Sequence, residues 1–143
     1  MADWTPPETS VEPPPRGNGE IVCIVDDEQL VLQATRLTLE RFGYKTVAFN
    51  SPTECLKALR QEPDGCAVLL TDQTMPGLTG LELSAQVREF SPELPIIIMS
   101  GYFSKVSTGA LEQIGNIALL AKPFVARDVL QAVAVAAASR PAR

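Results

Sequence analysis

Five short apolar runs, each followed by a longer amphipathic stretch, divide the chain between residues 21 and 139. The runs have the length of β-strands, and apolar residues in the longer stretches recur at helical spacing. Strands that alternate with helices form a parallel sheet covered on both faces, because each parallel strand needs a crossover connection to the next. The pattern therefore predicts one α/β domain. Its expected strands are 21–25, 46–49, 67–71, 95–100 and 117–121.

The longer stretches predict helices at 28–42, 52–61, 80–90, 105–114 and 126–139. In the first of them, Leu30, Ala34 and Leu37 recur at helical spacing. Such spacing is typical of the face that a helix buries against a sheet. We therefore expect Leu30 and Ala34 to belong to the core.

The first 19 residues differ in composition from the rest of the chain. Five of the twelve prolines lie there, together with several acidic residues. Such a segment cannot bury enough apolar surface to offset the entropy that is lost on ordering. We expect residues 1–19 to be a disordered, proline-rich linker or tail, and residues 20–143 to form the folded domain.

The chain of 143 residues contains no histidine and carries a formal net charge of −5. Histidine bases, serine–histidine or cysteine–histidine nucleophiles and most zinc sites are therefore excluded. The negative charge argues against a surface for nucleic acid or for anionic membranes. Cys23, Cys55 and Cys66 lack the spacing of metal ligands and lie among apolar residues. We expect them to be small buried side chains of a cytoplasmic protein.

Charged or hydroxyl residues end or follow four of the five predicted strands. Asp26 and Asp27 follow the first strand and Asp72 follows the third, Ser100 ends the fourth, and Lys122 follows the fifth. In an open parallel sheet, ligands bind at the carboxyl ends of the strands. We therefore expect three carboxylates, one hydroxyl and one ammonium group to meet at one edge of the fold.

This set of groups limits the chemistry. Three neighbouring carboxylates repel one another, and a hard divalent cation such as Mg²⁺ removes that repulsion. A carboxylate beside Mg²⁺ and a lysine can attack phosphorus and form an aspartyl phosphate, which a serine hydroxyl can then hydrogen-bond. The short loop at 73–80 contains a Pro76-Gly77 turn and can direct a backbone carbonyl at the metal.

Taken together, these motifs resemble the receiver domain of two-component response regulators, the CheY-like family. The resemblance covers about residues 20–139. In chain order, the motifs are Val25-Asp26-Asp27-Glu28, Leu70-Thr71-Asp72, Met75-Pro76-Gly77 with Gly80, Met99-Ser100-Gly101-Tyr102 and Lys122-Pro123-Phe124. The resemblance implies a flavodoxin-like, doubly wound fold with a five-stranded parallel sheet of order 2-1-3-4-5.

The resemblance also implies a role for each residue at the sheet edge. Asp72 would be the phosphoacceptor. Asp27 would bind Mg²⁺ directly and Asp26 through water, and Asp72 and the backbone carbonyl of Thr74 would complete the protein ligands. Ser100 would be the switch hydroxyl that binds the phosphoryl group.

Two further roles follow from the resemblance, and one position departs from it. Lys122 would contact the phosphoryl group, and its peptide bond to Pro123 would be cis. Many receivers have a tyrosine or phenylalanine three residues before the lysine, whose rotation reports phosphorylation. Leu119 occupies that position here. Tyr102 and Phe103 are candidates for a substitute bulky switch element.

The function implied is that of a phosphoacceptor in a two-component phosphorelay. The donor would be a histidine kinase or a histidine phosphotransfer protein, and it must be another protein or domain because this chain has no histidine. We expect no enzyme activity beyond self-phosphorylation and dephosphorylation at Asp72, no nucleic-acid or membrane contact, and weak or phosphorylation-dependent oligomerisation. The proline-rich linker and the motif at 119–124 resemble receivers of hybrid histidine kinases; a stand-alone response regulator is the alternative.

A phosphatase of the haloacid-dehalogenase type is the alternative from a different class, because it also combines Asp, Ser or Thr, and Lys with Mg²⁺. That family has its nucleophile after the first strand in an Asp-x-Asp arrangement, whereas Asp26 and Asp27 are adjacent here and Asp72 is isolated. A flavodoxin-like cofactor binder would need a glycine- and hydroxyl-rich phosphate loop after the first strand. The sequence there does not have that composition.

Overall fold

Strands and helices alternate along the whole folded part of the computed structural model, which describes residues 13–101 and 108–139. The strands are β1 (Ile21–Val25), β2 (Lys45–Phe49), β3 (Val68–Asp72), β4 (Ile96–Ser100) and β5 (Ile117–Ala121). The helices are α1 (Gln29–Arg41), α2 (Pro52–Gln61), α3 (Gly80–Arg88), α4 (Thr108–Ile114) and α5 (Ala126–Ser139). Every predicted element is present, and most boundaries are those predicted. The others differ by one or two residues, except that α4 begins at Thr108, and residues 105–107, predicted to begin it, lie outside the described residues.

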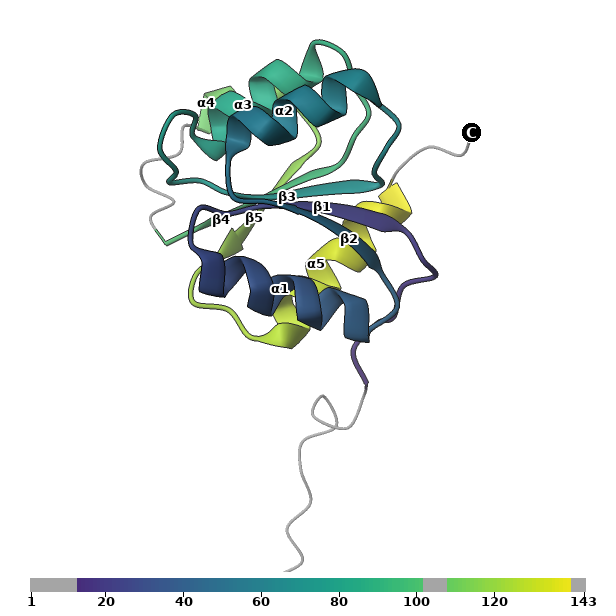
Figure 1. The fold of residues 1–143 in the computed structure, drawn as a ribbon. Coiled ribbons are helices and arrows are strands. Elements are labelled where there is room, and N and C mark those ends of the chain that lie inside the picture. Colours follow the sequence, from purple (N-terminus) through teal and green to yellow (C-terminus); the bar gives the residue numbers. More distant parts are fainter. Residues whose placement is uncertain (1–12, 102–107, 140–143) are drawn as a thin grey trace, which may run out of the picture.

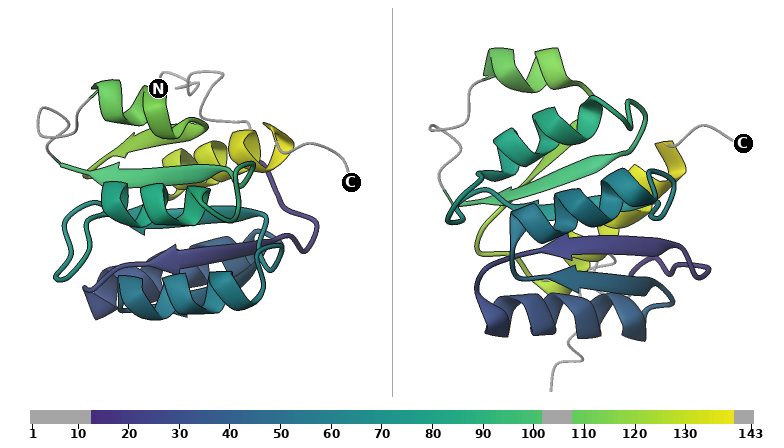
Figure 2. Two further views of the ribbon diagram at one scale, coloured as in Figure 1. Left: turned by 90° about the horizontal axis from the view of Figure 1, so that it is seen from above. Right: turned by 45° about the horizontal axis from the view of Figure 1, so that its top comes forward.

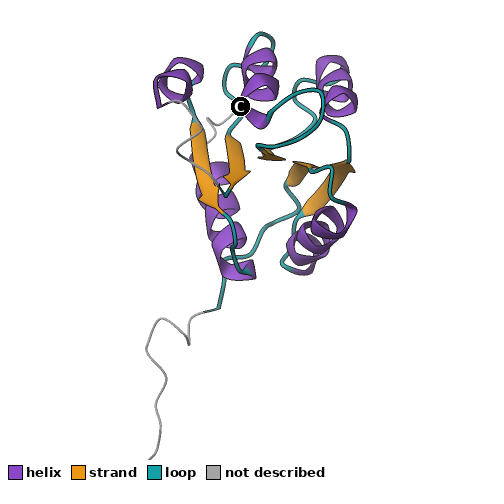
Figure 3. Cartoon of the chain, turned by 90° about the vertical axis from the view of Figure 1, so that its left-hand side faces the viewer, coloured by secondary structure: helices purple, strands orange, loops and turns teal. Residues whose placement is uncertain are grey.

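The five strands form one parallel sheet in the order β2-β1-β3-β4-β5, as the resemblance implied. Helices α1 and α5 lie on one face of the sheet, and α2, α3 and α4 lie on the other (Figures 1 and 2). Seen from the side, the sheet is the middle of three layers (Figure 3). The flavodoxin-like, doubly wound fold is therefore confirmed.

Alternate residues of each central strand point into two different cores. In β1, Val22 and Ile24 belong to the cluster under α1 and α5, and Cys23 and Val25 belong to the cluster under α2 and α3. A strand buried on both faces needs apolar residues at successive positions, which explains the continuous apolar runs. The three cysteines are free and buried, as predicted. Among the described residues, no helix is both long enough and apolar enough to cross a membrane.

Helix α1 buries a different face from the one predicted. Its buried residues are Leu32, Thr35 and Leu39. Leu30 is 88% exposed and Ala34 is also exposed, so the expectation that they belong to the core was wrong. The helix carries two interleaved apolar stripes, and the packing of α1 on the sheet decides which one is buried.

Two glycines of the predicted linker hydrogen-bond to the turn between α1 and β2. The Gly17 N–H donates to the Phe42 carbonyl and the Gly19 N–H to the Gly43 carbonyl, each at 2.7 Å. A Cβ atom at Gly17 would lie 2.5 Å from the ring of Tyr44. Only glycine allows so close an approach, and this end of the predicted linker therefore packs against the domain.

The two apolar stripes of α1 make a direct test of the packing. Leu39 is fully buried, and its replacement by alanine is expected to lower the free energy of unfolding by about 2–5 kcal/mol. Leu30→Ala removes the same atoms from an exposed site and is expected to change the free energy of unfolding by less than about 0.5 kcal/mol. Urea unfolding measures both. Equal losses would contradict the observed orientation of α1.

Candidate functional site

Backbone hydrogen bonds continue past the ends of the strands and place the polar residues that follow them. Val25 of β1 is opposite Thr71 of β3, so Asp26 and Asp72 come next at the same level of the sheet. The Asp26 N–H donates to the Phe49 carbonyl at 3.1 Å. The sheet itself therefore holds two acidic residues side by side.

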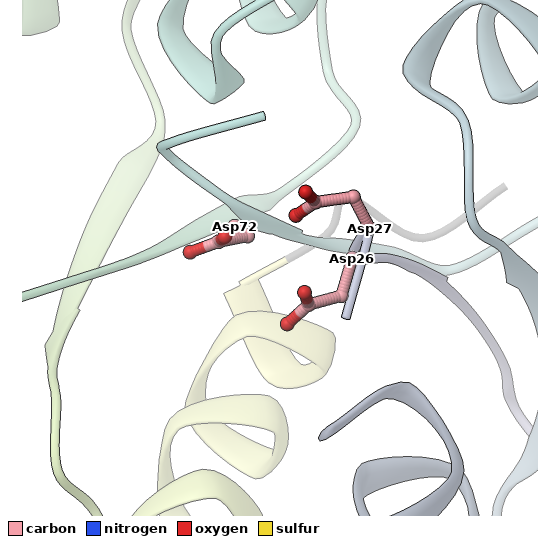
Figure 4. A group of neighbouring side chains, drawn as sticks. All are labelled: Asp26, Asp27 and Asp72. Carbon is pink, nitrogen blue, oxygen red and sulfur yellow. The ribbon is translucent and has the colours of Figure 1, made fainter. Parts of the chain in front are cut away.

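The carboxylates of Asp26, Asp27 and Asp72 form one cluster. One oxygen from each lies within 4.8 Å of the others. Figure 4 shows Asp26 and Asp27 at the end of β1, with both carboxylates extending toward the side on which Asp72 lies. Asp26 and Asp72 are buried, whereas Asp27 is exposed. The structure thus brings together the three acidic residues that the sequence predicted.

Lys122 reaches the same cluster from the end of β5. Its Nζ lies 2.9 Å from Asp72 Oδ1 and 4.0 Å from Asp26 Oδ2. The Lys122 N–H donates to the Ser100 carbonyl at 3.0 Å, which fixes its backbone at the sheet edge. Burial alone would lower the pKa of Lys122, but the neighbouring carboxylates outweigh burial and raise that pKa.

Asp26 combines a buried carboxylate with an incomplete set of hydrogen bonds. Its Oδ1 accepts a hydrogen bond from the Glu28 N–H at 2.9 Å, where α1 begins. Its Oδ2 is buried and has no hydrogen-bond partner. Burial raises the pKa of Asp26 to about 6, and the charge of Asp72 adds to the rise. When Asp26 is ionised, a cation that binds in the cluster stabilises the buried charge on this oxygen.

The donor set fits a hard divalent cation. Three carboxylates face one lysine, so the cluster keeps an excess of negative charge when all of them are ionised. Asp26 Oδ2 accepts no hydrogen bond, and its nearest cation, Lys122 Nζ, is 4.0 Å away and closer to Asp72. Oxygen donors with room for water suit Mg²⁺. Thr74, the predicted backbone ligand, is exposed in the loop that follows Asp72.

The loop after β3 is closed by tight packing at the start of α3. A Cβ atom at Gly80 would lie 2.6 Å from the Asp72 carbonyl oxygen, so only glycine fits there. Thr79 and Glu82 form a capping box: the Glu82 N–H donates to Thr79 Oγ1, and the Thr79 N–H donates to Glu82 Oε1. Helix α3 therefore begins directly against the backbone of Asp72.

The residues expected to act in switching are placed in three ways. Ser100 is buried at the end of β4, at the same sheet edge as the acids. Leu119 lies within β5, opposite Ile98, and is 36% exposed. Tyr102 and Phe103 lie outside the described residues. The Lys122–Pro123 peptide bond is cis, the isomer that the resemblance implied.

An apolar hollow of about 700 Å³ lies beside the acidic cluster and was missed in the sequence. Leu30 and Ala34 of α1 line one side, and Pro123 and Phe124 line another. Lys122 belongs to both the hollow and the cluster. The apolar stripe of Leu30 and Ala34 on α1 could have indicated this hollow, because an apolar helix face that is not buried in the core is a candidate contact surface.

Comparison with known proteins agrees with this geometry. Residues 22–134 match the family model described as the response regulator receiver domain. The chain belongs to the response regulator receiver family. A crystal structure of a response regulator receiver domain protein from Clostridium thermocellum superposes on the receiver with a TM-score of 0.77 at 26% identity, covering 83% of this chain and 94% of that one. Membership in this family removes the grounds for the phosphatase and cofactor-binder alternatives.

Curated relatives are longer than the receiver. The DNA-binding transcriptional regulator NtrC of Escherichia coli strain K12 is 35% identical over 116 residues, which are 80% of this chain and 24% of NtrC. The response regulator protein TmoT of Ectopseudomonas mendocina is 31% identical over 116 residues, which are 81% of this chain and 52% of TmoT. The chain thus spans about a quarter to a half of these relatives.

The raised pKa of Asp26 predicts how the metal-free receiver responds to pH. Its pKa is about 6 in the fold against an ordinary value of 3.8, so the folded state holds the proton more tightly. This contribution to stability is present at low pH and is lost as the pH rises from about 4 to about 6. Asp26→Asn should remove the effect, and its stability relative to wild type should rise by about 2 kcal/mol between about pH 4.5 and about pH 7.5.

Urea unfolding in the presence of a chelator, from about pH 4.5 to about pH 7.5, measures the difference. Other titrating groups affect both proteins and cancel in the comparison. Parallel curves for the wild type and Asp26→Asn would show that Asp26 ionises as it does in water.

Proposed function

We propose that this receiver accepts a phosphoryl group on Asp72 in a Mg²⁺-dependent reaction and thereby switches a signalling surface. The observation that carries the proposal is the contact of 2.9 Å between Lys122 Nζ and Asp72 Oδ1, beside Asp26 Oδ2, which accepts no hydrogen bond. One carboxylate is thus paired with a mobile cation, in a cluster whose remaining charge attracts a metal ion.

The geometry favours Asp72 over its two acidic neighbours as the nucleophile. Asp26 is fully buried, and one of its oxygens is already engaged by the Glu28 N–H. Asp27 is exposed and extends from the end of β1. Asp72 is in contact with Lys122 while still slightly exposed. It therefore combines access for a donor with a cation placed beside the reacting oxygen.

The proposed reaction is a single displacement at phosphorus. An Asp72 carboxylate oxygen forms the new P–O bond as the P–N bond to the imidazole of the donor histidine breaks, and the imidazole leaves. Mg²⁺, held by Asp26, Asp27, Asp72 and the Thr74 carbonyl, would neutralise charge on the phosphoryl oxygens. Lys122 exchanges its partner from the Asp72 oxygen to a phosphoryl oxygen.

We assign the switch to the adjacent strand ends. The buried Ser100 is at the same edge as Asp72 and supplies a hydroxyl for the phosphoryl group. Leu119, in β5, replaces the aromatic side chain usual in the family, and Tyr102 and Phe103 remain candidates for a bulky substitute. Movement of this region on phosphorylation would alter the surface that a partner reads.

The apolar hollow beside the cluster supports a protein donor. A phosphohistidine must approach Asp72 from outside, and Leu30, 88% exposed, stands where such a protein would touch α1. Large exposed apolar side chains next to a reacting group are typical of contact surfaces. We propose that a histidine kinase or phosphotransfer protein docks there.

The wider setting follows from the motifs and the cysteines. We favour the receiver of a hybrid histidine kinase, with a stand-alone response regulator as the alternative, and the neighbouring coding sequence distinguishes them. The three free thiols suit a reducing cytoplasm. Enzymatic activity would be limited to self-phosphorylation and dephosphorylation at Asp72.

Acetyl phosphate tests the chemistry without a protein donor. With Mg²⁺, the wild-type chain is expected to gain the mass of one phosphoryl group, measured by intact-mass spectrometry. Asp72→Asn should gain none, because the amide is a much weaker nucleophile, and a chelator should prevent the gain in the wild type. An unchanged mass, or equal labelling of Asp72→Asn, would overturn the proposal.

A pair of leucines on α1 tests the donor surface. With a phosphorylated histidine phosphotransfer protein that labels the wild type, Leu30→Ser should slow transfer by about tenfold or more, while its labelling by acetyl phosphate stays unchanged. Leu37→Ser is the matched control, because Leu37 is 62% exposed on the same helix but away from the hollow. Equal rates for the two variants would argue against docking at Leu30.

A further inference from the structure

The residue after Asp72 holds the first turn of α3 with both its main chain and its side chain. The Gln73 carbonyl accepts a hydrogen bond from the Gly80 N–H at 3.0 Å, and Gln73 Oε1 accepts one from the Leu81 N–H at 2.9 Å. The Gln73 N–H donates to the Met99 carbonyl of β4 at 2.9 Å. One half-buried side chain thus joins the end of β3 to α3.

Gln73 and the Thr79–Glu82 capping box together satisfy the start of this helix. An α-helix begins with four N–H groups that lack partners within the helix. Gln73 accepts from the N–H groups of Gly80 and Leu81. Thr79 Oγ1 accepts from the Glu82 N–H at 3.1 Å, and Glu82 Oε1 accepts from the Thr79 N–H at 2.9 Å. Gln73 and Thr79 both stabilise α3, but only Gln73 is next to the proposed phosphoacceptor, Asp72, in the sequence.

Thr74 lies between two anchored neighbours. On one side, Gln73 is tied to β4 and to α3. On the other side, the Met75 side chain is buried in the core under α2 and α3. The following residues, Pro76 and Gly77, are exposed. The position of the Thr74 carbonyl is therefore set over a very short length of chain, between the buried Met75 and Gln73, which is held by two main-chain hydrogen bonds and by that of its side chain.

We propose that Gln73 is a positioning residue for the metal site: by accepting the Leu81 N–H, its side chain helps to fix the loop that carries the Thr74 carbonyl, the proposed backbone ligand of Mg²⁺. This inference rests on the proposed function, because it takes Thr74 as a ligand. Mg²⁺ requires nearly ideal octahedral geometry, so a small displacement of one ligand weakens binding. Mutation of a residue that orients a metal ligand in this way typically lowers the metal affinity by about tenfold or more.

The test separates the position of the loop from the stability of α3. Gln73→Met keeps the length of the side chain and removes the acceptor, whereas Thr79→Ala weakens the same helix start at its other acceptor. Amide NMR shifts of the full chain, titrated with MgCl₂, give the dissociation constant. We expect it to rise about tenfold in Gln73→Met. It should stay at the wild-type value in Thr79→Ala, although urea unfolding shows both variants to be destabilised.

A second readout separates binding from chemistry. With acetyl phosphate, Gln73→Met should label slowly at low Mg²⁺ and reach the wild-type rate at saturating Mg²⁺, because the reacting groups are unchanged. Gln73→Ala, measured alongside, should behave in the same way.

Three results would overturn the inference: wild-type Mg²⁺ affinity in both Gln73 variants, an equal loss of affinity in Thr79→Ala, or a rate deficit that saturating Mg²⁺ does not restore. If the wild type itself neither binds Mg²⁺ nor gains a phosphoryl group, the proposed function fails as well. If the wild type does both and the Gln73 variants match it, only the role of Gln73 fails.

Discussion

Repulsion among carboxylates that cannot move apart is the constraint around which this site is built. The ladder between β1 and β3 places Asp26 and Asp72 at the same level, and backbone hydrogen bonds at the strand ends hold them there. Lys122 offsets part of the charge, and the buried Oδ2 of Asp26 is left without a hydrogen-bond partner. A fold tolerates such a cost where a ligand or a reaction relieves it. Because a bound cation would relieve this repulsion, the same charge that is unfavourable without a metal favours the binding of one.

The rest of the molecule separates stability from reactivity. Two apolar clusters, one on each face of the sheet, contain almost no charged groups and stabilise the fold. The polar groups to which we assign the reaction lie at the last residues of the strands or just beyond them. Because the sheet is rigid there, the carboxylates and the lysine keep their distances without support from long loops. In the described part of the chain, the loop that carries the proposed ligand Thr74 is tied back to α3 by Gln73.

Much of this could be predicted from the residues, and the failures have particular causes. The continuous apolar runs predict buried parallel strands, and a parallel sheet brings Asp26, Asp72 and Lys122 to one edge whatever the details of packing. The strand order came from the family resemblance, because an alternating pattern is compatible with several orders. Leu30 was assigned to the wrong face, since two apolar stripes on α1 satisfy the same periodicity. The docking of Gly17 was missed because its partners are backbone carbonyls, which leave no sequence signal.

The sequence by itself determined the class of fold, the acidic cluster and the lysine that faces it, because these depend on strand periodicity and on which residue follows each strand. Only the tertiary structure decided which oxygen of Asp26 lacks a hydrogen bond, which face of α1 borders the site, and that Gln73 caps α3. These features depend on distances between segments far apart in the chain or on the direction of single side chains. Sequence periodicity predicts neither, because it describes one helix or strand at a time, whereas a contact joins two of them.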